Sequence, residues 1–326
     1  MDLKPLPLVS IIAVTYNHSS YIEEAIKSLL NQTYSPLEII ISDDNSTDDT
    51  FIKAQNFIRQ YQGPHKVILN RNNKNLGIGG NVSAAIQLSN GSLLVSADCD
   101  DISEPNRISE LMTIWQSLNP KPNLLTSDAW DTTQEGQDLD VKICHNLEEI
   151  KSTKDWLKKN PIFFGCTNIY TRDLIIKFGL VSNECGATDQ IMVLRSILMG
   201  GALSVHKSLV HHRQNGVTGN KPKNISAKID RLIKDSSRTI ADIEQHIKDA
   251  KILGQGAIIE AHFKNKLSEA KLIPKIFSAV TLKEKIKVFF ADQNTPLNKK
   301  IRLLSYAIMP ELHESLFKIK NLIRFE

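Results

Sequence analysis

We predict an α/β fold for the first 130 residues, because short apolar runs rich in β-branched residues alternate with amphipathic stretches four times. Strands that are joined through helices run parallel, so we expect a mostly parallel sheet flanked by helices. The apolar runs have the length of buried strands. They cover Leu8–Thr15, Leu37–Ser42, Lys66–Asn70 and Ser92–Ala97.

Several local signals predict where the helices of this part begin. Ser20-Tyr-Ile-Glu23 has the pattern of a capping box, which predicts a helix start at this point. Ser46 and Thr47 are candidate caps of a second helix. A third helix is predicted over Val82–Leu88, and Ser103 is the expected cap of the helix after the fourth strand.

The chain beyond residue 220 has a helical pattern. Apolar residues recur there with a spacing of three, four or seven, which is typical of an amphipathic helix and of the seam of a helical dimer. They are Ile225, Ile229, Leu232, Ile233, Ile240, Ile243 and Ile247. Further helices are expected around 257–271, 281–291, 297–308 and 311–323, separated by Pro274, Pro296 and Pro310.

Charge divides the chain in the same way. Residues 1–220 carry 19 basic and 24 acidic side chains, and residues 221–326 carry 21 and 12. We therefore expect a catalytic or ligand-binding domain over 1–220, with halves of about 1–128 and 129–220, and a basic helical region over 221–326. The basic region fits two interpretations. It is attracted to an anionic partner such as a membrane surface, or it is a solvated helical surface rich in lysine.

Composition restricts the class of protein. Apolar residues make up 41% and charged residues 23%, as in folded globular proteins. Four scattered cysteines form no C-x-x-C pair, so we expect no zinc site or disulfide framework and a reducing cytoplasm. We find neither a signal-peptide layout nor an apolar run near the ~20 residues of a membrane span. The expected location is the cytoplasm or the inner face of its membrane, without a nucleic-acid partner.

Polar residues follow each of the four predicted strands. In open parallel sheets, ligands bind beyond the carboxyl ends of the strands, and these ends meet at one edge. We therefore expect one site built from four loops. The loops are Thr15–His18, Asp43–Asp49, Asn75–Gly77 and Asp98–Asp101.

Asp98, Asp100 and Asp101 form the most acidic of these loops. A hard divalent cation such as Mg²⁺ takes one or two carboxylates and completes its shell with water and substrate phosphates. A metal held in this way can stabilise a departing diphosphate. The alternative is a solvated acidic turn that caps the next helix.

Asp43 and Asp44 form a second acidic cluster, in which a carboxylate can accept a hydrogen bond from the imide N–H of uracil. The ring of Tyr16 is available to stack on the base. Capping of the following helix explains Ser46, Thr47 and Asp48 equally well, but it does not explain the two acids upstream.

Two further features lie later in the chain. Asp189 precedes a helical run and is either a general base for an acceptor hydroxyl or an ordinary helix cap. Arg213, after a predicted short strand over Ala202–Val205, has the fork geometry to pair with a diphosphate. The neighbouring His211 and His212 lack a third ligand, and such pairs are more often structural.

Taken together, these segments resemble the inverting family 2 glycosyltransferases with the GT-A (Rossmann-like) fold. The similarity covers roughly residues 8–220. The matching segments are Val9–Asn17, Leu30–Asp48, Asn75–Gly77 with Asn81, Asp98–Asp101, Phe178-Gly179, Thr188-Asp189 and Arg195–Gly200.

The resemblance implies transfer of a hexose or N-acetylhexosamine from a nucleoside diphosphate donor, with UDP as the expected nucleotide. Asp100 would ligate Mn²⁺ or Mg²⁺ with help from Asp101, Asp98 would lie near the ribose, and Asp189 would be the base. The acceptor would be a glycan or a lipid-linked glycan of a bacterial cell-surface pathway. The remaining donor-binding residues would be Thr15, Tyr16, Asn17, Asp43, Asp44, Asn75, Gly77 and Arg213.

This chain departs from the family pattern at two positions. Thr188 replaces a usual Glu before the base. His212-Arg213-Gln214-Asn215 replaces the common Tyr-Arg-Gln-His, which puts the local diphosphate or acceptor contacts in doubt.

Other classes of protein fit the residues less well. A nicotinamide enzyme needs G-x-G-x-x-G after the first strand, where this chain has Thr15-Tyr-Asn-His18. A nucleotidyltransferase should carry a basic, glycine-rich loop at the same place. A nucleotide-sugar-binding protein without turnover remains an alternative. For the basic region we expect attachment to an anionic membrane surface, pairing of two chains, or both.

Overall fold

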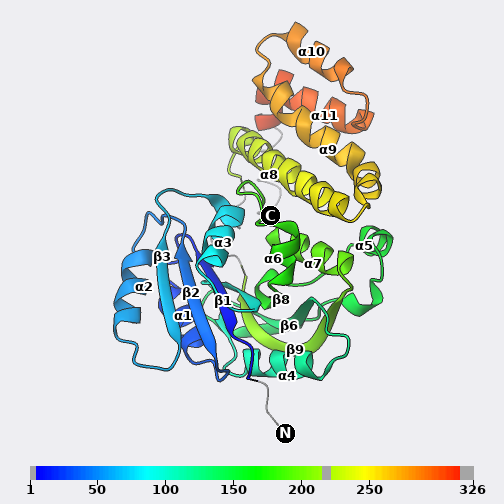
Figure 1. Ribbon diagram of the computed structural model, residues 1–326. Coiled ribbons are helices and arrows are strands. Elements are labelled where there is room, and N and C mark those ends of the chain that lie inside the picture. Colours follow the sequence, from blue (N-terminus) through cyan, green and yellow to red (C-terminus); the bar gives the residue numbers. More distant parts are fainter. Residues whose placement is uncertain (1–4, 215–221, 316–326) are drawn as a thin grey trace.

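The computed structural model describes residues 5–214 and 222–315, and it has the predicted α/β architecture (Figure 1). Four parallel strands form one half of the sheet, in the order β3-β2-β1-β4. Each agrees with its predicted strand to within one residue at both ends. Their bounds are β1 Val9–Thr15, β2 Leu37–Asp43, β3 Lys66–Arg71 and β4 Leu93–Asp98.

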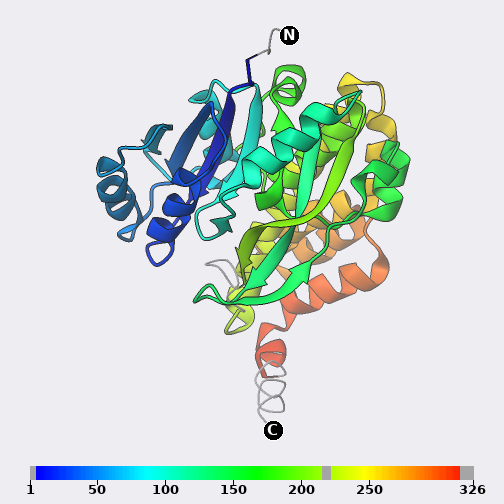
Figure 2. The same ribbon diagram turned by 90° about the horizontal axis from the view of Figure 1, so that it is seen from below.

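The other half of the sheet is mixed. Beyond β4 the order continues β8-β6-β9-β5, with the β6–β9 pair parallel and the other pairs antiparallel. A further strand, β7, pairs with β6. Figure 2 shows the long strands β6 and β9 side by side. The bounds are β5 Ile102–Ser103, β6 Leu124–Thr132, β7 Asp138–Lys142, β8 Ile169–Thr171 and β9 Ala202–Arg213.

The short strand predicted over Ala202–Val205 is wrong in length. Strand β9 continues to Arg213, because its second half pairs with β6 up to Thr132. That half is polar apart from Leu209 and Val210 and contains three histidines, so it lacks the apolar run of a buried strand. As a consequence, His211 and Arg213 lie on the strand, not after it.

Alternation along the strands divides the core between the two faces of the sheet. Ile12, Ile40 and Leu94 pack on one face against α3 (Gly77–Gln87), α6 (Asp173–Phe178) and α7 (Thr188–Leu198). Their strand neighbours Ile11 and Ile39 pack on the other face against α1 (Ile22–Leu30), α2 (Thr50–Arg59) and α4 (Arg107–Ser117). Successive strand residues point to opposite faces, so both layers follow from the sequence pattern.

Three predicted helix caps are wrong. Helix α1 begins at Ile22 without a side-chain cap, so the Ser20 capping box does not form. Helix α2 begins at Thr50, where Asp48 accepts from the backbone N–H in place of Ser46. Ser103 lies in β5 and its hydroxyl accepts from Arg107. The hydroxyls of Ser46 and Ser103 bond the nearby side chains of Asp43 and Arg107 instead of capping a helix.

Helix α3 begins at Gly77, five residues before the predicted Val82. Gly79 and Gly80 lie inside its first turns and are buried. Two glycines so close together weaken the propensity signal of a helix, which is why the pattern placed its start too late.

Four complete helices follow the gap in the described residues, and residues 310–315 are helical as well. The four are α8 (Ile225–Ile252), α9 (Gly256–Ser278), α10 (Leu282–Ala291) and α11 (Leu297–Ile308). The prediction of helices here is confirmed, although Pro274 lies within α9. The predicted helix over 311–323 reaches beyond residue 315 and so lies partly outside the described residues. None of the helices in the described ranges is long and apolar enough to cross a bilayer.

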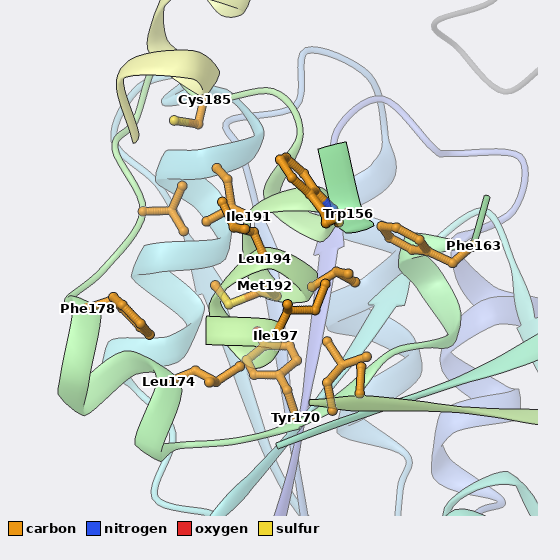
Figure 3. Packing of buried hydrophobic residues seen from close by; sticks show 14 of the residues in the cluster. Trp156, Phe163, Tyr170, Leu174, Phe178, Cys185, Ile191, Met192, Leu194 and Ile197 are labelled. Carbon is orange, nitrogen blue, oxygen red and sulfur yellow. The ribbon is translucent and has the colours of Figure 1, made fainter. Parts of the chain in front are cut away.

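Helix α8 packs directly on the α/β part. Its residues Ile243, Ile247 and Ala250 belong to the same buried cluster as Ile191 and Leu194 of α7. Figure 3 shows this cluster around Trp156, which lies in the short helix α5 (Thr153–Lys159). A smaller cluster joins α9 to α11. The division at residue 220 stays a prediction, and α8 shares the core of the first part.

Candidate active site

The predicted residues Asp98 and Asp189 line one cavity of about 220 Å³. Asp98 ends β4, whereas Asp189 lies in the first turn of α7. The side walls include Val14, Ser96 and Gly165. The fold therefore brings together two carboxylates that are far apart in the sequence, at the carboxyl edge of the parallel strands.

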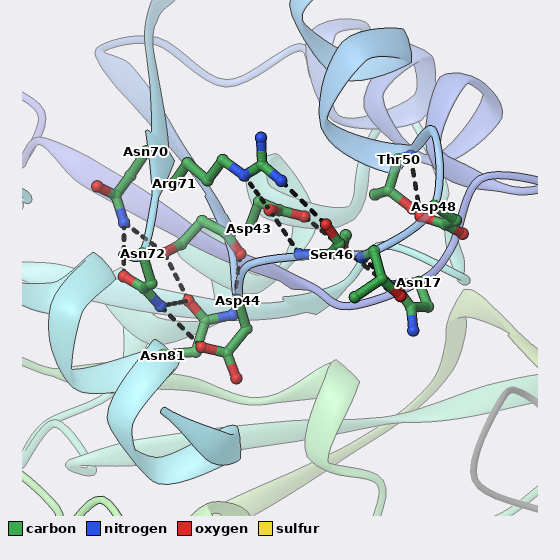
Figure 4. Close-up of polar contacts among 12 residues, drawn as sticks. Asn17, Asp43, Asp44, Ser46, Asp48, Thr50, Asn70, Arg71, Asn72 and Asn81 are labelled. Carbon is green, nitrogen blue, oxygen red and sulfur yellow. Dashed lines mark hydrogen bonds and ion pairs between the residues drawn. The ribbon is translucent and has the colours of Figure 1, made fainter. Parts of the chain in front are cut away.

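Asp44 holds the loop that leads into α3 (Figure 4). Its Oδ1 accepts from Asn72 Nδ2 at 2.9 Å and from the backbone N–H of Leu76 at 2.8 Å. Its Oδ2 accepts from the backbone N–H of Gly77 at 2.9 Å. Asn75 Oδ1 accepts from the same Gly77 N–H at 3.1 Å. The φ of Gly77 is +76°, a value that favours glycine.

Asp43 holds the next turn of the same loop. One of its oxygens accepts from the backbone N–H of Ser46 at 3.0 Å, and the Nε of Arg71 lies 3.5 Å away. Asn17, from the loop after β1, accepts from the backbone N–H of Thr47 at 2.9 Å. These contacts explain the acids that helix capping could not, because each carboxylate satisfies buried donors of the loop.

Thr15 and Tyr16 lie beside this loop but differ in exposure. The Thr15 side chain is buried, and its hydroxyl has no partner among the described residues. Its carbonyl accepts from the backbone N–H of Asp44 at 2.9 Å. The Tyr16 side chain is 37% exposed, so its ring is open to a stacking partner.

Asp98, Asp101 and the thiol of Cys166 have ligand atoms within 4.8 Å of one another. Burial, followed by repulsion from Asp101 and Asp100, raises the pKa of Asp98 to about 8. Burial, followed by repulsion from Asp100, raises the pKa of Asp101 to about 7. Oδ2 of Asp101 has no hydrogen-bond partner among the described residues. The cluster thus holds more negative charge than its protein partners neutralise.

These oxygens fit a hard divalent cation, as an orphaned carboxylate oxygen and two crowded acids indicate. Burial also raises the pKa of the Cys166 thiol, so the sulfur stays protonated and the carboxylates are the better ligands. Sequence reasoning did not select Cys166, because this residue lies far from every motif and meets Asp101 only through the fold.

Arg213 holds the acidic turn that contains Asp100 and Asp101. Its backbone N–H donates to Asp101 Oδ1 at 3.0 Å, and Nη1 donates to the carbonyl of Asp100 at 2.6 Å. Its guanidinium also pairs with Glu24 and lies over the ring of Tyr21. The observed contacts fix the backbone of the turn, and the predicted contact with a diphosphate stays a prediction.

Two histidines lie near the acidic turn. His18, which sequence reasoning did not select, has Nε2 3.8 Å from Asp100 Oδ2, and burial lowers its pKa despite that carboxylate. His211 bridges Glu104 and Asp138, both at 2.7 Å. Burial alone would lower its pKa, but these two hydrogen bonds outweigh burial and raise it. His211 is thus structural. Gln214 is the last described residue of its segment, and Asn215 lies outside the described residues.

Asp189 is not a helix cap, because Ala187 occupies the N-cap position of α7. Burial raises the pKa of the Asp189 carboxyl, which makes it a stronger base when ionised. Gly165 lies against it. A Cβ at Gly165 would be 3.0 Å from the Asp189 Cβ, so this position suits glycine. The sequence alone did not indicate Gly165.

A second group of potential ligands lies around a larger hollow of about 620 Å³. It contains Asp128, Cys144 and His206. Asp128 accepts from the backbone N–H of Cys144 at 2.8 Å and from its thiol at 3.1 Å. His206 bonds Asn146 at 2.6 Å. These groups satisfy one another, and none of them belongs to the predicted site.

The parallel strands, the polar loops at their carboxyl edge and the acidic cluster define an α/β enzyme fold of the GT-A class. The sequence profile described as Glycosyl transferase family 2 matches residues 10–178, more than half of the chain. The chain belongs to this glycosyltransferase family, as the sequence motifs indicated.

Two named bacterial glycosyltransferases are similar over the first part of the chain. Chondroitin synthase of Escherichia coli is 39% identical over 106 residues, which is 32% of this chain and 15% of that protein. GalNAc(5)-diNAcBac-PP-undecaprenol beta-1,3-glucosyltransferase of Campylobacter jejuni is 38% identical over 107 residues, or 33% and 34%. The match spans about a third or less of each relative's length.

Two solved structures share the fold over most of the chain. TarS 1-349 of S. aureus, in complex with UDP-GlcNAc, matches with a TM-score of 0.54 and 16% identity. The match covers 92% of this chain and 87% of the TarS chain. The mannosyltransferase PcManGT of Pyrobaculum calidifontis, in complex with GDP-Man and Mn²⁺, has a TM-score of 0.53 and 16% identity, with coverage of 95% and 90%. At this identity they support the fold alone.

Proposed function

We propose that this chain is an inverting glycosyltransferase that moves a hexose or N-acetylhexosamine from a UDP-sugar to an acceptor hydroxyl. The observation that carries the proposal is the cavity lined by both Asp98 and Asp189. A donor bound at the edge of β4 would present its anomeric carbon to a base on α7. The Asp44 loop and the exposed ring of Tyr16 would receive the nucleotide.

The proposal of uracil as the base is supported by the bonding of Asp44. Its Oδ2 accepts only the Gly77 N–H among the described residues, so it keeps capacity for one further donor. The imide N–H of uracil is such a donor. TarS was solved with UDP-GlcNAc, whereas PcManGT was solved with GDP-Man, so a direct comparison of nucleotides decides between them.

Asp100 and Asp101, with Asp98 beside them, would hold Mn²⁺ or Mg²⁺. When bound, the metal supplies charge neutralisation for the diphosphate of the donor. Arg213 keeps the turn in shape through the Asp100 carbonyl and the Asp101 carboxylate. PcManGT, a structural neighbour, binds Mn²⁺ with its donor.

Asp189 would accept the proton of the acceptor hydroxyl while the hydroxyl oxygen forms a bond to the anomeric carbon. The bond between that carbon and the diphosphate oxygen breaks in the same step, and its electron pair leaves with the nucleoside diphosphate. Attack from the face opposite the leaving group inverts the configuration, so an α-linked donor gives a β-linked product. The apolar walls formed by Ile12, Val82 and Met192 help to exclude water, which would otherwise compete as acceptor.

We propose a glycan or lipid-linked glycan of a bacterial cell surface as the acceptor. The support comes from two relatives. The Campylobacter enzyme acts, by its name, on an undecaprenol-linked glycan, and the Escherichia coli relative is a polysaccharide synthase. Because the matches cover about a third or less of those proteins, the acceptor is assigned only by class.

We also propose that the C-terminal helices bring the enzyme to an anionic membrane surface. Nine exposed large apolar side chains lie between residues 280 and 312, interspersed with lysines. They are Val280, Leu282, Ile286, Phe290, Leu297, Ile301, Ile308, Met309 and Leu312. Apolar side chains beside lysines are typical of helices that lie in an anionic interface.

Co-sedimentation with phosphatidylglycerol vesicles tests this proposal. We expect binding that weakens when salt is added and when neutral vesicles replace the anionic ones, and binding that is unchanged by both would contradict the proposal. Pairing of two chains through the same helices is the rival, and light scattering without lipid detects it.

The central test measures release of nucleoside diphosphate from a panel of nucleotide sugars, with Mn²⁺, Mg²⁺ or EDTA. We expect metal-dependent release with one donor, reduced about 100- to 1,000-fold in Asp100→Ala. Asp189→Asn should lose about 100-fold or more. Asp140→Asn, an exposed acid on β7, is the matched control and should behave as wild type.

Other products would favour other classes of protein. Release of pyrophosphate from a nucleoside triphosphate in the presence of a sugar 1-phosphate would indicate a nucleotidyltransferase. Metal-dependent binding of a nucleotide sugar, without release when pooled glycan and lipid-linked acceptors are added, would indicate a binding protein. If no nucleotide bound at all, the assignment of both acidic loops to a donor site would be wrong.

A further inference from the structure

The segment 179–187 leads into Asp189 and is enclosed between helices from two different parts of the chain. It follows α6 and ends at the first turn of α7. Helix α3 lies on one side and α8 lies on the other (Figure 1). The position of Asp189 therefore depends on how these two helices hold the segment.

Helix α3 contacts the segment through its backbone. The Gly79 N–H donates to the carbonyl of Cys185 at 3.1 Å, and Ser83 Oγ donates to the carbonyl of Val181 at 2.9 Å. A Cβ at Gly79 would come within 2.2 Å of the Ser182 carbonyl oxygen, so the helix approaches as closely as only glycine allows. This side is linked to the nucleotide loop, because α3 begins at Gly77, which Asp44 holds.

Helix α8 contacts the segment through positions 242 and 245 and contacts α7 through position 249, all spaced along one face of the helix. Asp242 Oδ1 accepts from the backbone N–H of Gly186 at 2.8 Å and of Ala187 at 3.1 Å. Gln245 accepts from the backbone N–H of Ser182 at 3.2 Å. Asp249 pairs at 2.7 Å with Arg195 of α7, and both side chains are fully buried.

The bonds to Asp242 occur where α7 lacks support of its own. Its N-cap residue is Ala187, which has no side-chain oxygen to accept from the free backbone N–H groups at a helix start. The carboxylate of Asp242 supplies an acceptor and a negative charge at that positive end of the helix. Asp189 is only two residues beyond Ala187, so loss of this support would let its carboxylate move.

We infer that Asp242 is a positioning residue for Asp189, and that α8 of the basic helical region completes the active site. The inference rests on the proposed function, in which Asp189 is the base. It also means that the helical region does more than attach the enzyme to a surface. One face of α8 holds the segment that carries the reacting group.

Two measurements on the full chain test this inference, with variants Asp242→Ala and Asp242→Asn. Asn keeps an oxygen that accepts from the backbone, whereas Ala does not. Asp235→Ala is the matched control, because Asp235 lies on α8 with its side chain 53% exposed and pairs only with Arg231 of the same helix among the ion pairs found in the described residues. Thermal unfolding of each variant checks that the fold is retained.

Amide hydrogen exchange measures directly whether Asp242 protects the backbone N–H groups that it bonds, and it does not depend on activity. In Asp242→Ala the amides of Gly186 and Ala187 should exchange about 10-fold faster or more, because they lose a hydrogen bond to a charged group. Exchange in β1 and β2 should stay unchanged. Asp242→Asn should restore most of the protection. Equal exchange in wild type and Asp242→Ala would overturn the inference. If Asp242→Ala does not fold, Asp242→Asn decides by the same readout, with faster exchange at Gly186 and Ala187 than in Asp235→Ala expected.

Steady-state kinetics then separates positioning from a merely structural role. We expect kcat to fall about 10- to 100-fold in Asp242→Ala with little change in KM for the donor, because a displaced base slows the chemical step without weakening donor binding. Asp242→Asn should recover most of kcat. A wild-type enzyme without transfer would refute the proposed function, while exchange still tests the support. If exchange is faster but kcat is unchanged in an active enzyme, the inference that Asp242 positions Asp189 is wrong, while the proposed function stands.

Discussion

The acids after β2 and the acids after β4 lie at the same edge of the sheet, but their carboxylates are bonded in opposite ways. Asp43 and Asp44 accept hydrogen bonds from backbone N–H groups and from Ser46 and Asn72. Oδ2 of Asp101, by contrast, has no hydrogen-bond partner among the described residues, and Asp98 is crowded by Asp101 and Asp100.

The two clusters therefore differ in what they contribute to the stability of the fold. A buried carboxylate that accepts several N–H bonds stabilises the loop around it. A carboxylate crowded by other acids destabilises the fold unless a cation neutralises it. Sequence shows two acidic strings of similar length, whereas bonding shows that the first builds the loop and the second is suited to a metal.

The largest effect should distinguish the two clusters by stability. Asp44→Ala removes the acceptor of three hydrogen bonds, two of them from backbone N–H groups at the start of α3. We expect the free energy of unfolding to fall by about 3 kcal/mol. Asp98→Asn, measured without metal, should leave it unchanged or raise it, since burial and the neighbouring acids disfavour the charge. Urea unfolding measures both. Similar losses of unfolding free energy in Asp44→Ala and Asp98→Asn would show that the two clusters do not differ in this way.

A smaller effect should depend on pH. Burial would raise the pKa of Asp48, but hydrogen bonds from Thr50 and Ser19 outweigh burial and lower it. A carboxyl with a depressed pKa in the folded state stabilises above its unfolded pKa, and the stabilisation is lost as the pH falls through the folded value. Asp48→Asn should therefore cost about 1 kcal/mol at pH 7 and less at pH 3. Urea titrations at both values check this, and a cost that grows on acidification would show the opposite sign.

The smallest effect should come from the buried hydroxyl of Thr15, which lies beside the loop of Asp43 and Asp44. Thr15→Val removes a hydroxyl without a partner and keeps the shape of the side chain. We expect the free energy of unfolding to change by less than about 1 kcal/mol. Thermal unfolding and a titration with UDP measure stability and binding separately. Weaker binding at equal stability would support the nucleotide contact, whereas a large loss of stability would reveal an unseen role in the core.

Regular elements were predictable where one local signal was strong. The four parallel strands follow from short apolar runs, and their ends agree to within one residue. Prediction failed where the signal came from a distant partner. Strand β9 extends to Arg213 because β6 pairs with its polar half. The caps failed for a local reason, because Ser46 and Ser103 bond the nearby side chains of Asp43 and Arg107.

The sequence by itself determined the α/β class, the family and the loops that carry the acids, because strand periodicity and the motifs are local. Only the tertiary structure decided which acids are satisfied and which are not. It also decided that Cys166 meets Asp101, and that Asp242 on α8 holds the segment before Asp189. Hydrogen bonding and burial depend on residues far apart in the chain, and no local pattern records which of them the fold brings into contact.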